Sequence, residues 1–415
     1  MSSVKSGVLS FEDARHLVEH QAGTVSAPGT ELVSFLQSAG RVLAEPIVAD
    51  RDFPPFPRAT RDGYAVRAAD IATVPVALHV IGEIKAGAAD GPPLLVGHGQ
   101  AVSIMTGAAI PSGADAVVMV EYTSASSQAV DVTRSVSVGE NIVPAGSEAK
   151  QGTILVDKGT RLGAATVALA ASVGKSQLQV YQRPRIAVLA TGDELVEVDA
   201  RPGPQQIRNS NSYSLAIQVE AAGGEAVILP VAPDESKRLR ELIMKGLECD
   251  LLLLSGGVSM GKYDLVEQVL QELHADFFFT GAQIQPGRPI VFGRVPQGEG
   301  DGASRYFFGL PGNPVSTMVT FELFARPMVE ALGGMVPNPI KFAHAELKSE
   351  IKTRTGLSRF LPGVLSGEFE ATKVELVPWQ GSGDIAATAR ANCYVVIPPD
   401  RDRLAPGEWV AVLLR

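Results

Sequence analysis

The spacing of apolar residues changes along the chain, and the changes indicate separate structural regions. Between Arg183 and Gly333, short unbroken apolar runs alternate with segments in which apolar residues recur every three to four positions. An unbroken run is typical of a strand buried on both faces, and the longer spacing is typical of an amphipathic helix. Strands and helices that alternate in this way predict an α/β domain with a central parallel sheet and right-handed crossovers.

The run Leu251–Leu254 is the clearest buried strand of this region. It leads into the glycine turn SGGVSMGKYD, and Asp264 fits the N-cap of the helix that follows. The other expected strands are 185–192, 225–231 and 305–310, with a further β segment at 289–293. The other expected helices are 209–222 and 234–245, with a last one that begins near Asn313 and Pro314.

The chain on either side of this α/β region has a different pattern. A capped helix is expected after Ser10, a second helix from Thr30 towards Gly40, and a small-residue helix between Gly159 and Gly174. Short β runs broken by Gly and Pro fill 50–146, and β runs return after 334. The predicted domains are a helical N-terminal domain (1–49 plus 147–182), an inserted β domain (50–146), the α/β domain (183–333) and a C-terminal β domain (334–415).

Composition narrows the class of protein. The 415 residues carry a formal net charge of -9, which argues against bulk binding to nucleic acid or to an anionic membrane. Only two cysteines and six scattered histidines occur, so neither a disulfide framework nor a zinc site is supported. The N-terminus has no apolar core of signal-peptide length, and no apolar run reaches the length of a membrane span. A reducing cytoplasm fits best.

Three short turns carry the candidate chemistry of the α/β region. They are ATGDEL (190–195), SGGVSMG (255–261) and GLPGNP (309–314), and each follows a predicted strand. Open parallel sheets bind ligands at the carboxyl ends of their strands, so the three turns define one candidate crevice. Backbone N–H groups there suit phosphate, and the carboxylates suit a hard cation such as Mg²⁺. The alternative is that the glycines only make tight turns, with Asp264 a helix cap and Glu194 solvated.

Other motifs lie outside these turns. Arg288 in QPGRP is a plausible contact for an oxyanion, although an arginine beside Pro and Gly is also common on surfaces. Asp62 in RDGYAV and Thr106 in IMTGA lie on glycine-containing loops of the inserted β region. If they serve the same site as the α/β turns, that site forms between domains, and different subunits of a dimer could supply its parts. No GxxxxGK[ST] motif is present, which argues against a P-loop ATPase.

In order along the chain, the motifs DGYAV, IMTGAAIPSGADAVV, TGDEL, SGGVSMGKYD, QPGRP, GLPGNPVS and GEWV resemble those of the molybdopterin molybdenumtransferase family, the MoeA proteins and the E domain of gephyrin. The resemblance spans nearly the whole chain. It implies an L-shaped homodimer with a helical first domain, an inserted β domain, a molybdopterin-adenylyltransferase-like α/β domain and a C-terminal β domain. It also implies an enzyme that cleaves adenylylated molybdopterin and inserts molybdate, giving molybdenum cofactor and AMP with the help of Mg²⁺.

Individual residues fall on positions that matter in the family. The resemblance assigns catalytic roles to Asp62, Thr106, Glu194, Asp234 and Asp264, and metal binding to Asp264 and Glu194. It places the nucleotide phosphate or the pterin against Gly256, Gly257, Ser259, Pro311, Gly312, Asn313 and Pro314. Ser259, Arg288 and Ser382 match positions that would offer hydroxyl and cationic donors to the molybdate dianion.

The chain departs from the family pattern at several positions. Gln285 stands where the family often has Lys, and Pro362 where it has Arg, which leaves Arg354 or Arg359 as possible replacements. Arg61, Glu148 and Asn209 also replace the usual residues. Two other functions therefore remain open: a homologue that binds the cofactor or organises partners without turnover, and an enzyme that inserts tungstate. Expected partners are molybdopterin adenylyltransferase and the chaperones of molybdoenzymes, with no nucleic acid and no membrane.

Overall fold

The computed structural model describes residues 7–415 except 88–92, 258–264, 297–303, 337 and 369–370. The chain forms two compact units. Unit 1 consists of Met1–Ala44, Gly159–Leu162 and Leu178–Arg415, and unit 2 consists of Glu45–Lys158 and Gly163–Gln177. In the part of the chain that the structure describes, no helix combines the length and apolar character needed to cross a membrane.

Unit 1 contains a six-stranded sheet that matches the predicted α/β region. Its order is β17 (Glu225–Ile228), β14 (Arg185–Ala190), β18 (Leu251–Ser255), β23 (Ser304–Leu310), β22 (Val291–Pro296) and β19 (Asp276–Phe279). The first four strands are parallel, as predicted. β22 and β19 are antiparallel to their neighbours. No described helix separates these last strands along the chain, and a helical crossover is what a parallel connection normally requires.

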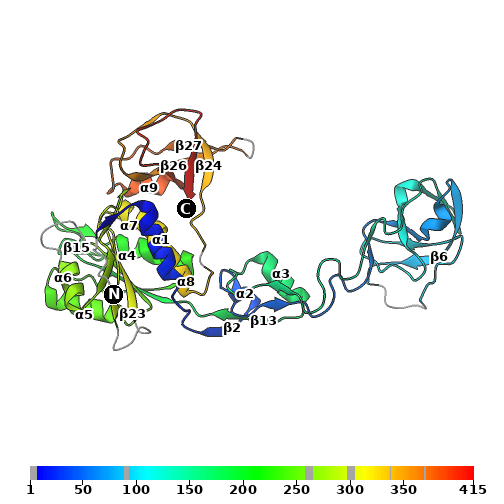
Figure 1. The fold of residues 1–415 in the computed structure, drawn as a ribbon, viewed down its shortest axis with the longest axis horizontal. Coiled ribbons are helices and arrows are strands. Elements are labelled where there is room, and N and C mark those ends of the chain that lie inside the picture. Colours follow the sequence, from blue (N-terminus) through cyan, green and yellow to red (C-terminus); the bar gives the residue numbers. More distant parts are fainter. Residues whose placement is uncertain (1–6, 88–92, 258–264, 297–303, 337, 369–370) are drawn as a thin grey trace. The chain divides into compact units, whose positions relative to one another are not determined.

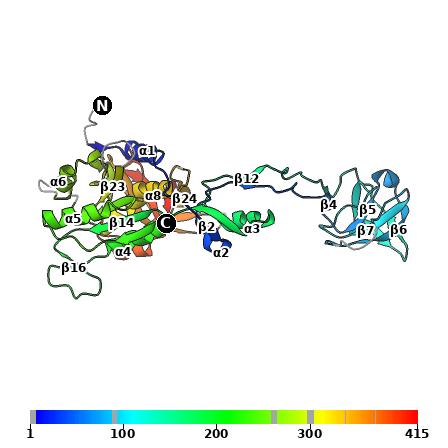
Figure 2. The same cartoon turned by 90° about the horizontal axis from the view of Figure 1, so that it is seen from below.

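Helices cover both faces of this sheet. One face packs against α1 (Phe11–Ala22), α4 (Asn211–Ala222), α7 (Pro314–Thr320) and α8 (Arg326–Leu332), and α1 lies along α8 (Figure 1). The other face packs against α5 (Ser236–Gly246) and α6 (Leu265–Glu272), which lie beside each other (Figure 2). Leu251 and Leu253 face the first helix layer, and Leu252 and Leu254 face the second. The unbroken leucine run therefore exists because both faces of β18 are buried.

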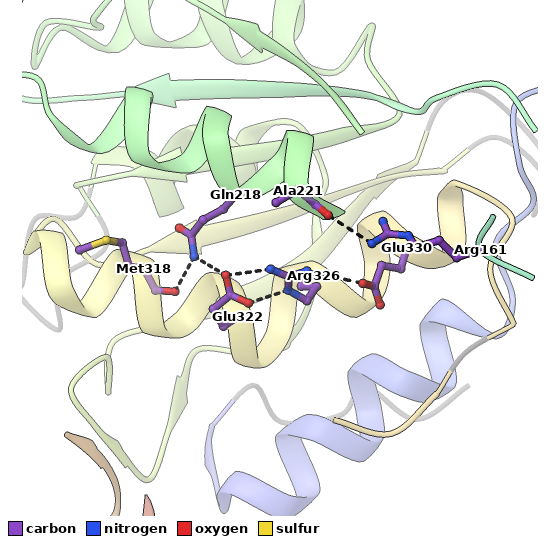
Figure 3. Close-up of polar contacts among 7 residues, drawn as sticks. All are labelled: Arg161, Gln218, Ala221, Met318, Glu322, Arg326 and Glu330. Atoms are coloured by element: carbon purple, nitrogen blue, oxygen red, sulfur yellow. Dashed lines mark hydrogen bonds and ion pairs between the residues drawn. The ribbon is translucent and has the colours of Figure 1, made fainter. Parts of the chain in front are cut away.

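A buried polar network joins α4 to the helices that follow β23 (Figure 3). Between α7 and α8 the chain forms a π-helical segment, η3 (Phe321–Ala325). Glu322 in this segment accepts hydrogen bonds from Gln218 Nε2 at 2.6 Å and from Arg326 Nε at 2.5 Å, and Arg326 Nη1 lies 3.6 Å from Glu330 Oε1. The network holds α4 against α7 and α8, and these helices carry part of the candidate site.

A closed five-stranded barrel follows the sheet and confirms the predicted C-terminal β domain. Its strands are β24 (Ala343–Leu347), β26 (Ser358–Ser366), β27 (Lys373–Leu376), β28 (Cys393–Ile397) and β30 (Trp409–Leu414). The short strand β21 (Ile284–Gln285), from the QPGRP loop, pairs with β26, so the loop is joined to the barrel by backbone hydrogen bonds. α9 (Ile385–Arg390) precedes β28, and β25 (Ile351–Lys352) pairs with β29 (Arg403–Leu404).

One predicted helix of the N-terminal region is wrong. The segment from Thr30 towards Gly40 forms the strand β2 (Thr30–Ser34) and a single turn of helix, α2 (Phe35–Ser38). β2 pairs with β13 (Gln177–Tyr181), and Val33 is buried while Leu36 is 95% exposed. Strand pairing with a segment distant in sequence therefore overrides the helical spacing of Leu32, Val33 and Leu36.

Unit 2 contains the predicted β-rich region. Its sheet has the order β8 (Ala116–Met119), β5 (Gly63–Val66), β7 (Gln100–Ile104), β6 (Val76–Ile84), β10 (Ala129–Val132) and β9 (Thr123–Ala125). The unit also contains the small-residue helix α3 (Ala164–Ser172), η1 (Ala68–Ile71) and η2 (Val120–Tyr122). Two short strand pairs complete it: β3 (Ile47–Val48) with β12 (Ile154–Val156), and β4 (Arg58–Ala59) with β11 (Ile142–Val143).

Candidate functional site

The structure brings the three glycine-containing turns of unit 1 together. Thr191 N donates to Ser255 O at 3.0 Å, and Gly256 N donates to Leu310 O at 3.2 Å. Gly256 has φ 91°, and a Cβ there would lie 2.6 Å from Thr191 O, so only glycine fits. The turns after β14, β18 and β23 therefore form one continuous edge, as expected from their position at the ends of parallel strands.

The first cavity at this edge has a volume of about 450 Å³ and is here called the acidic cavity. Its walls include these residues proposed from the sequence: Glu194, Asp234, Gly256, Gly257, Pro311, Gly312, Asn313 and Pro314. The short pair β15 (Leu195–Val196) and β16 (Ile207–Arg208) adds Leu195, Ile207 and Arg208 to its border. Ser259 and Asp264 belong to 258–264, outside the described residues, so their predicted roles remain predictions.

Two carboxylates give the acidic cavity its character. The carboxylate of Glu194 folds back over Gly192, whose φ of 143° and missing side chain make room for it. Asp234 Oδ1 accepts a hydrogen bond from Thr191 Oγ1 at 3.3 Å, and Asp234 N donates to Asp193 Oδ1 at 3.0 Å. Within the described part of the chain, neither Glu194 nor Asp234 forms an ion pair. Carboxylates without a protein cation suit a hard divalent metal.

The described residues contain no group of three or more His, Cys, Asp or Glu side chains arranged to hold a metal. A hard cation in the acidic cavity would therefore use Glu194 and Asp234 together with phosphate oxygens or water, which is the usual mode for Mg²⁺. The donor chemistry of the cavity fits such an ion.

Asn211 is a site residue that the sequence interpretation missed. Its Nδ2 donates to Ser255 Oγ and to Gly312 O, both at 2.8 Å, and so joins the start of α4 to two of the turns. Its buried Oδ1 has no hydrogen-bond partner among the described residues. The neighbouring Asn209 accepts a hydrogen bond from Ser212 N at 3.2 Å, so this replacement of the usual aspartate still supports the first turn of α4. The polar sequence Asn-Ser-Asn at the start of a predicted helix is the feature from which Asn211 could have been identified as a site residue.

A second cavity of about 790 Å³ adjoins the first and is here called the basic cavity. Arg288, Arg354, Arg359 and Ser382 line it, and its lining contains no Asp or Glu. It shares Pro289, Pro311 and Asn313 with the acidic cavity. The QPGRP loop, the start of α7 and the barrel build its walls. The structure thus brings Arg288 and Ser382 together, as expected for an oxyanion pocket.

The replacements at 285 and 362 have different surroundings. Gln285 lines the basic cavity, and its Oε1 accepts a hydrogen bond from Arg359 Nε at 2.8 Å. Pro362 is buried in the middle of β26, pairs with Tyr394, and is absent from the cavity lining. The two arginines named as possible replacements, Arg354 and Arg359, both reach the cavity.

Asp62 and Thr106 are brought together in unit 2, where they lie at the ends of neighbouring strands β5 and β7. Asp62 Oδ1 accepts hydrogen bonds from Thr106 N at 2.6 Å and from Thr106 Oγ1 at 2.8 Å. These two bonds to the charged form lower the pKa of the Asp62 carboxyl below its ordinary value. The pair therefore holds an ionised, exposed carboxylate in a fixed orientation.

Three family models together match most of the chain. They are described as the MoeA N-terminal region (domain I and II), matching residues 9–174, a probable molybdopterin binding domain, matching 187–331, and the MoeA C-terminal region (domain IV), matching 344–414. The chain is also similar to the molybdopterin molybdenumtransferase of Nostoc sp., with 35% identity over 398 residues that cover 94% of this chain and 89% of the relative. The enzyme of that name from Bacillus subtilis is 34% identical over 398 residues and is 90% covered.

Solved structures resemble the whole chain as well. A molybdopterin biosynthesis MoeA protein from Pyrococcus horikoshii OT3 has a TM-score of 0.77 and 30% identity, with 98% of this chain and 100% of that chain covered. A second structure of a MoeA protein from this organism has a TM-score of 0.71 and 34% identity, with 98% and 99% covered. The similarity thus extends through every described domain.

Proposed function

Since the chain belongs to the molybdopterin molybdenumtransferase family, we propose that it inserts molybdate into adenylylated molybdopterin and releases AMP during molybdenum cofactor biosynthesis. The observation that carries this proposal is the pair of adjoining cavities with opposite charge, which share Pro289, Pro311 and Asn313. The reaction needs an adenylyl phosphate with its metal on one side and a tetrahedral oxyanion on the other. Two cavities that share a wall would hold the adenylyl phosphate and the oxyanion next to each other.

The acidic cavity suits the adenylyl end of the substrate. Glu194 and Asp234, with Asp264, would hold Mg²⁺ against the phosphate, and the metal would draw charge from the bond that breaks when AMP leaves. Gly256, Gly257 and the turn 311–314 would border the nucleotide phosphate or the pterin. Asn211 Oδ1, which has no described partner, would accept a hydrogen bond from the substrate.

The basic cavity suits the molybdate dianion. The guanidinium groups of Arg288 and Arg354 form no hydrogen bond or ion pair with another described residue, and the Ser382 hydroxyl has none either. Guanidinium and hydroxyl donors stabilise a tetrahedral dianion through charge-assisted hydrogen bonds, and Ser259 would add another hydroxyl. Tungstate has the same charge and shape, so the same donors would bind it.

The proposal extends to the assembly and location of the protein. We propose a homodimer in the cytoplasm with Mg²⁺ as cofactor, in which the Asp62–Thr106 pair takes part in catalysis. The cytoplasmic location rests on the cysteine usage, since Cys249 and Cys393 are both free and buried. A molybdopterin adenylyltransferase would supply the substrate, and molybdoenzyme chaperones would receive the product. Light scattering that finds only a stable monomer would contradict the dimer.

The test is a turnover assay with the purified protein, adenylylated molybdopterin and Mg²⁺. Molybdate, tungstate, sulfate or no oxyanion is added, and AMP and active cofactor are measured. We expect AMP release that depends on molybdate or tungstate. The matched variants are Glu194→Gln, which should lose turnover, and Glu197→Gln, three residues further along the same loop and outside the cavity lining, which should keep it. Substrate binding without any oxyanion-dependent AMP release would favour the non-catalytic scaffold instead.

A further inference from the structure

Two residues that line the basic cavity lie side by side. Gln285 on β21 and Arg359 on β26 occupy paired positions of neighbouring parallel strands. Arg359 Nε donates to Gln285 Oε1 at 2.8 Å, and Arg359 Nη1 donates to Leu357 O at 3.1 Å. A guanidinium has five N–H donors, so two are used and three remain for a ligand. The two bonds fix the plane of the guanidinium at the cavity wall.

The charge of Arg359 is not balanced by the protein residues described. Arg359 is only 6% exposed, and no described carboxylate pairs with it. Several other partly buried arginines of this unit are paired, such as Arg326 with Glu322 and Glu330, and Arg41 with Glu31. A buried charge without a counter-charge is costly, so its position beside a cavity indicates that an anionic ligand completes the pair.

The neutral side chain at 285 is suited to this arrangement. A glutamine can accept the hydrogen bond from Arg359, whereas a lysine has no acceptor and would place a second positive charge within a few ångströms. Gln285 thus accepts a hydrogen bond from Arg359 without adding a second cation, and Arg359 is held in a fixed direction on the barrel strand.

We propose that Arg359, oriented by Gln285, is an anion-binding residue of the basic cavity and binds a tetrahedral dianion directly through its free N–H groups. The inference rests on the proposed function for the identity of that dianion as molybdate or tungstate. It predicts that positions 285 and 359 are energetically coupled, so that the effect of a cation at 285 depends on the residue at 359.

The experiment measures the dissociation constant of molybdate by equilibrium dialysis, with molybdenum counted by mass spectrometry. The proteins are the wild type, Arg359→Gln, Gln285→Lys and the double variant. Arg359→Gln should weaken binding about tenfold or more, as expected for loss of charge-assisted hydrogen bonds. Gln285→Lys should also weaken binding, although it adds positive charge, because it displaces Arg359. In the Arg359→Gln background the same change should strengthen binding.

A second variant and a matched control protect the test against misfolding. Gln285 is exposed, so Gln285→Glu should fold normally, form an ion pair with Arg359 and weaken molybdate binding by a similar factor. Lys352→Gln removes a positive charge from the barrel outside the cavity, where Lys352 pairs with Glu350, and should leave binding within twofold. Thermal unfolding confirms that each variant remains folded.

The two hypotheses fail in different ways. Wild-type affinity in Arg359→Gln, or tighter binding by Gln285→Lys in both backgrounds, would overturn the role of Arg359 even if turnover is normal. Coupled effects of the two positions on molybdate binding would support the role of Arg359 even if the wild-type protein shows no oxyanion-dependent AMP release. The absence of such AMP release would count only against the proposed function.

Discussion

The acidic and basic cavities share a wall, yet their charges have opposite sign because different elements supply their side chains. The carboxylates of the acidic cavity lie on loops that follow β14 and β17 of the sheet. The arginines of the basic cavity come from the QPGRP loop, β26 and the segment just before β26. The barrel therefore contributes half of the candidate site, and the pairing of β21 with β26 aligns the two halves.

The shared wall is rigid. Thr317 is fully buried in α7, and its hydroxyl shares its one proton between Pro311 O and Asn313 O. Val315 N donates to Ser382 O at 3.0 Å, which joins the start of α7 to the loop before α9. The separation between the two ligands is therefore set by backbone and buried side chains, which suits a reaction that depends on orientation.

The strongest test of the difference between the cavities removes charge from the acidic one. Glu194→Gln and Asp234→Asn should each lower turnover roughly 100-fold if the proposed Mg²⁺ binds there, since losing a direct metal ligand costs at least as much as losing a residue that only hydrogen-bonds to a ligand. Molybdate affinity should stay within twofold of wild type. Turnover and equilibrium dialysis measure the two effects separately, and a large loss of affinity would show that the cavities do not act independently.

The reciprocal test removes charge from the basic cavity. Arg288→Gln should raise the KM for molybdate about tenfold or more and leave the KM for adenylylated molybdopterin unchanged, because a charge-assisted hydrogen bond contributes about 1.5–3 kcal/mol. Sulfate, another tetrahedral dianion, should compete with molybdate in the wild type. Equal increases in both KM values would contradict the division into two cavities.

A smaller effect is expected from a change in the shared wall. Thr317→Val removes the buried hydrogen bond that the hydroxyl shares between Pro311 O and Asn313 O, and should lower the free energy of unfolding by about 1–3 kcal/mol. Both KM values should rise a few-fold together, in contrast to the two preceding tests. Chemical denaturation and steady-state kinetics measure this, with Thr372→Val, in the C-terminal region outside both cavities, as the control.

The smallest expected effect concerns a carboxylate that belongs to neither cavity. Hydrogen bonds from Thr106 lower the pKa of Asp62 below the value of about 3.9 that it has in the unfolded chain. These bonds therefore stabilise the folded protein at pH values above the unfolded pKa, and their stabilisation is lost as the pH falls through the folded pKa. Thr106→Val removes the hydroxyl bond and keeps the backbone one, so it should raise the Asp62 pKa only part of the way towards the unfolded value. A carboxyl titration by NMR measures the change, and an unaltered midpoint would show that the hydroxyl bond does not contribute to it.

The sequence predicts local features well and pairings across the fold poorly. The run Leu251–Leu254 and the glycine-containing turns are each defined by neighbouring residues, and the run, ATGDEL, GLPGNP and the described start of SGGVSMG (255–257) lie where the sequence predicted. The helix expected after Thr30 was wrong because β2 is stabilised by pairing with a distant strand. The contact between Gln285 and Arg359 joins residues 74 positions apart, so no local pattern in the sequence reveals that the two side chains meet. Asn211 was missed because its partners lie on two other turns.

The π-helical segment between α7 and α8 sets the rotational phase of one half of a long helix relative to the other. A π-helical turn is closed by a hydrogen bond between residues five apart, so it holds one residue more than an α-helical turn, which is closed between residues four apart. Deleting one residue from this wide turn would leave an ordinary α-helical turn and keep α7 and α8 nearly in their present orientation. The same deletion inside α7 would turn every later side chain by about 100° about the helix axis, and the contact between Gln218 and Glu322 in Figure 3 would be lost. The wide turn is therefore the place where this long helix best tolerates a change in chain length.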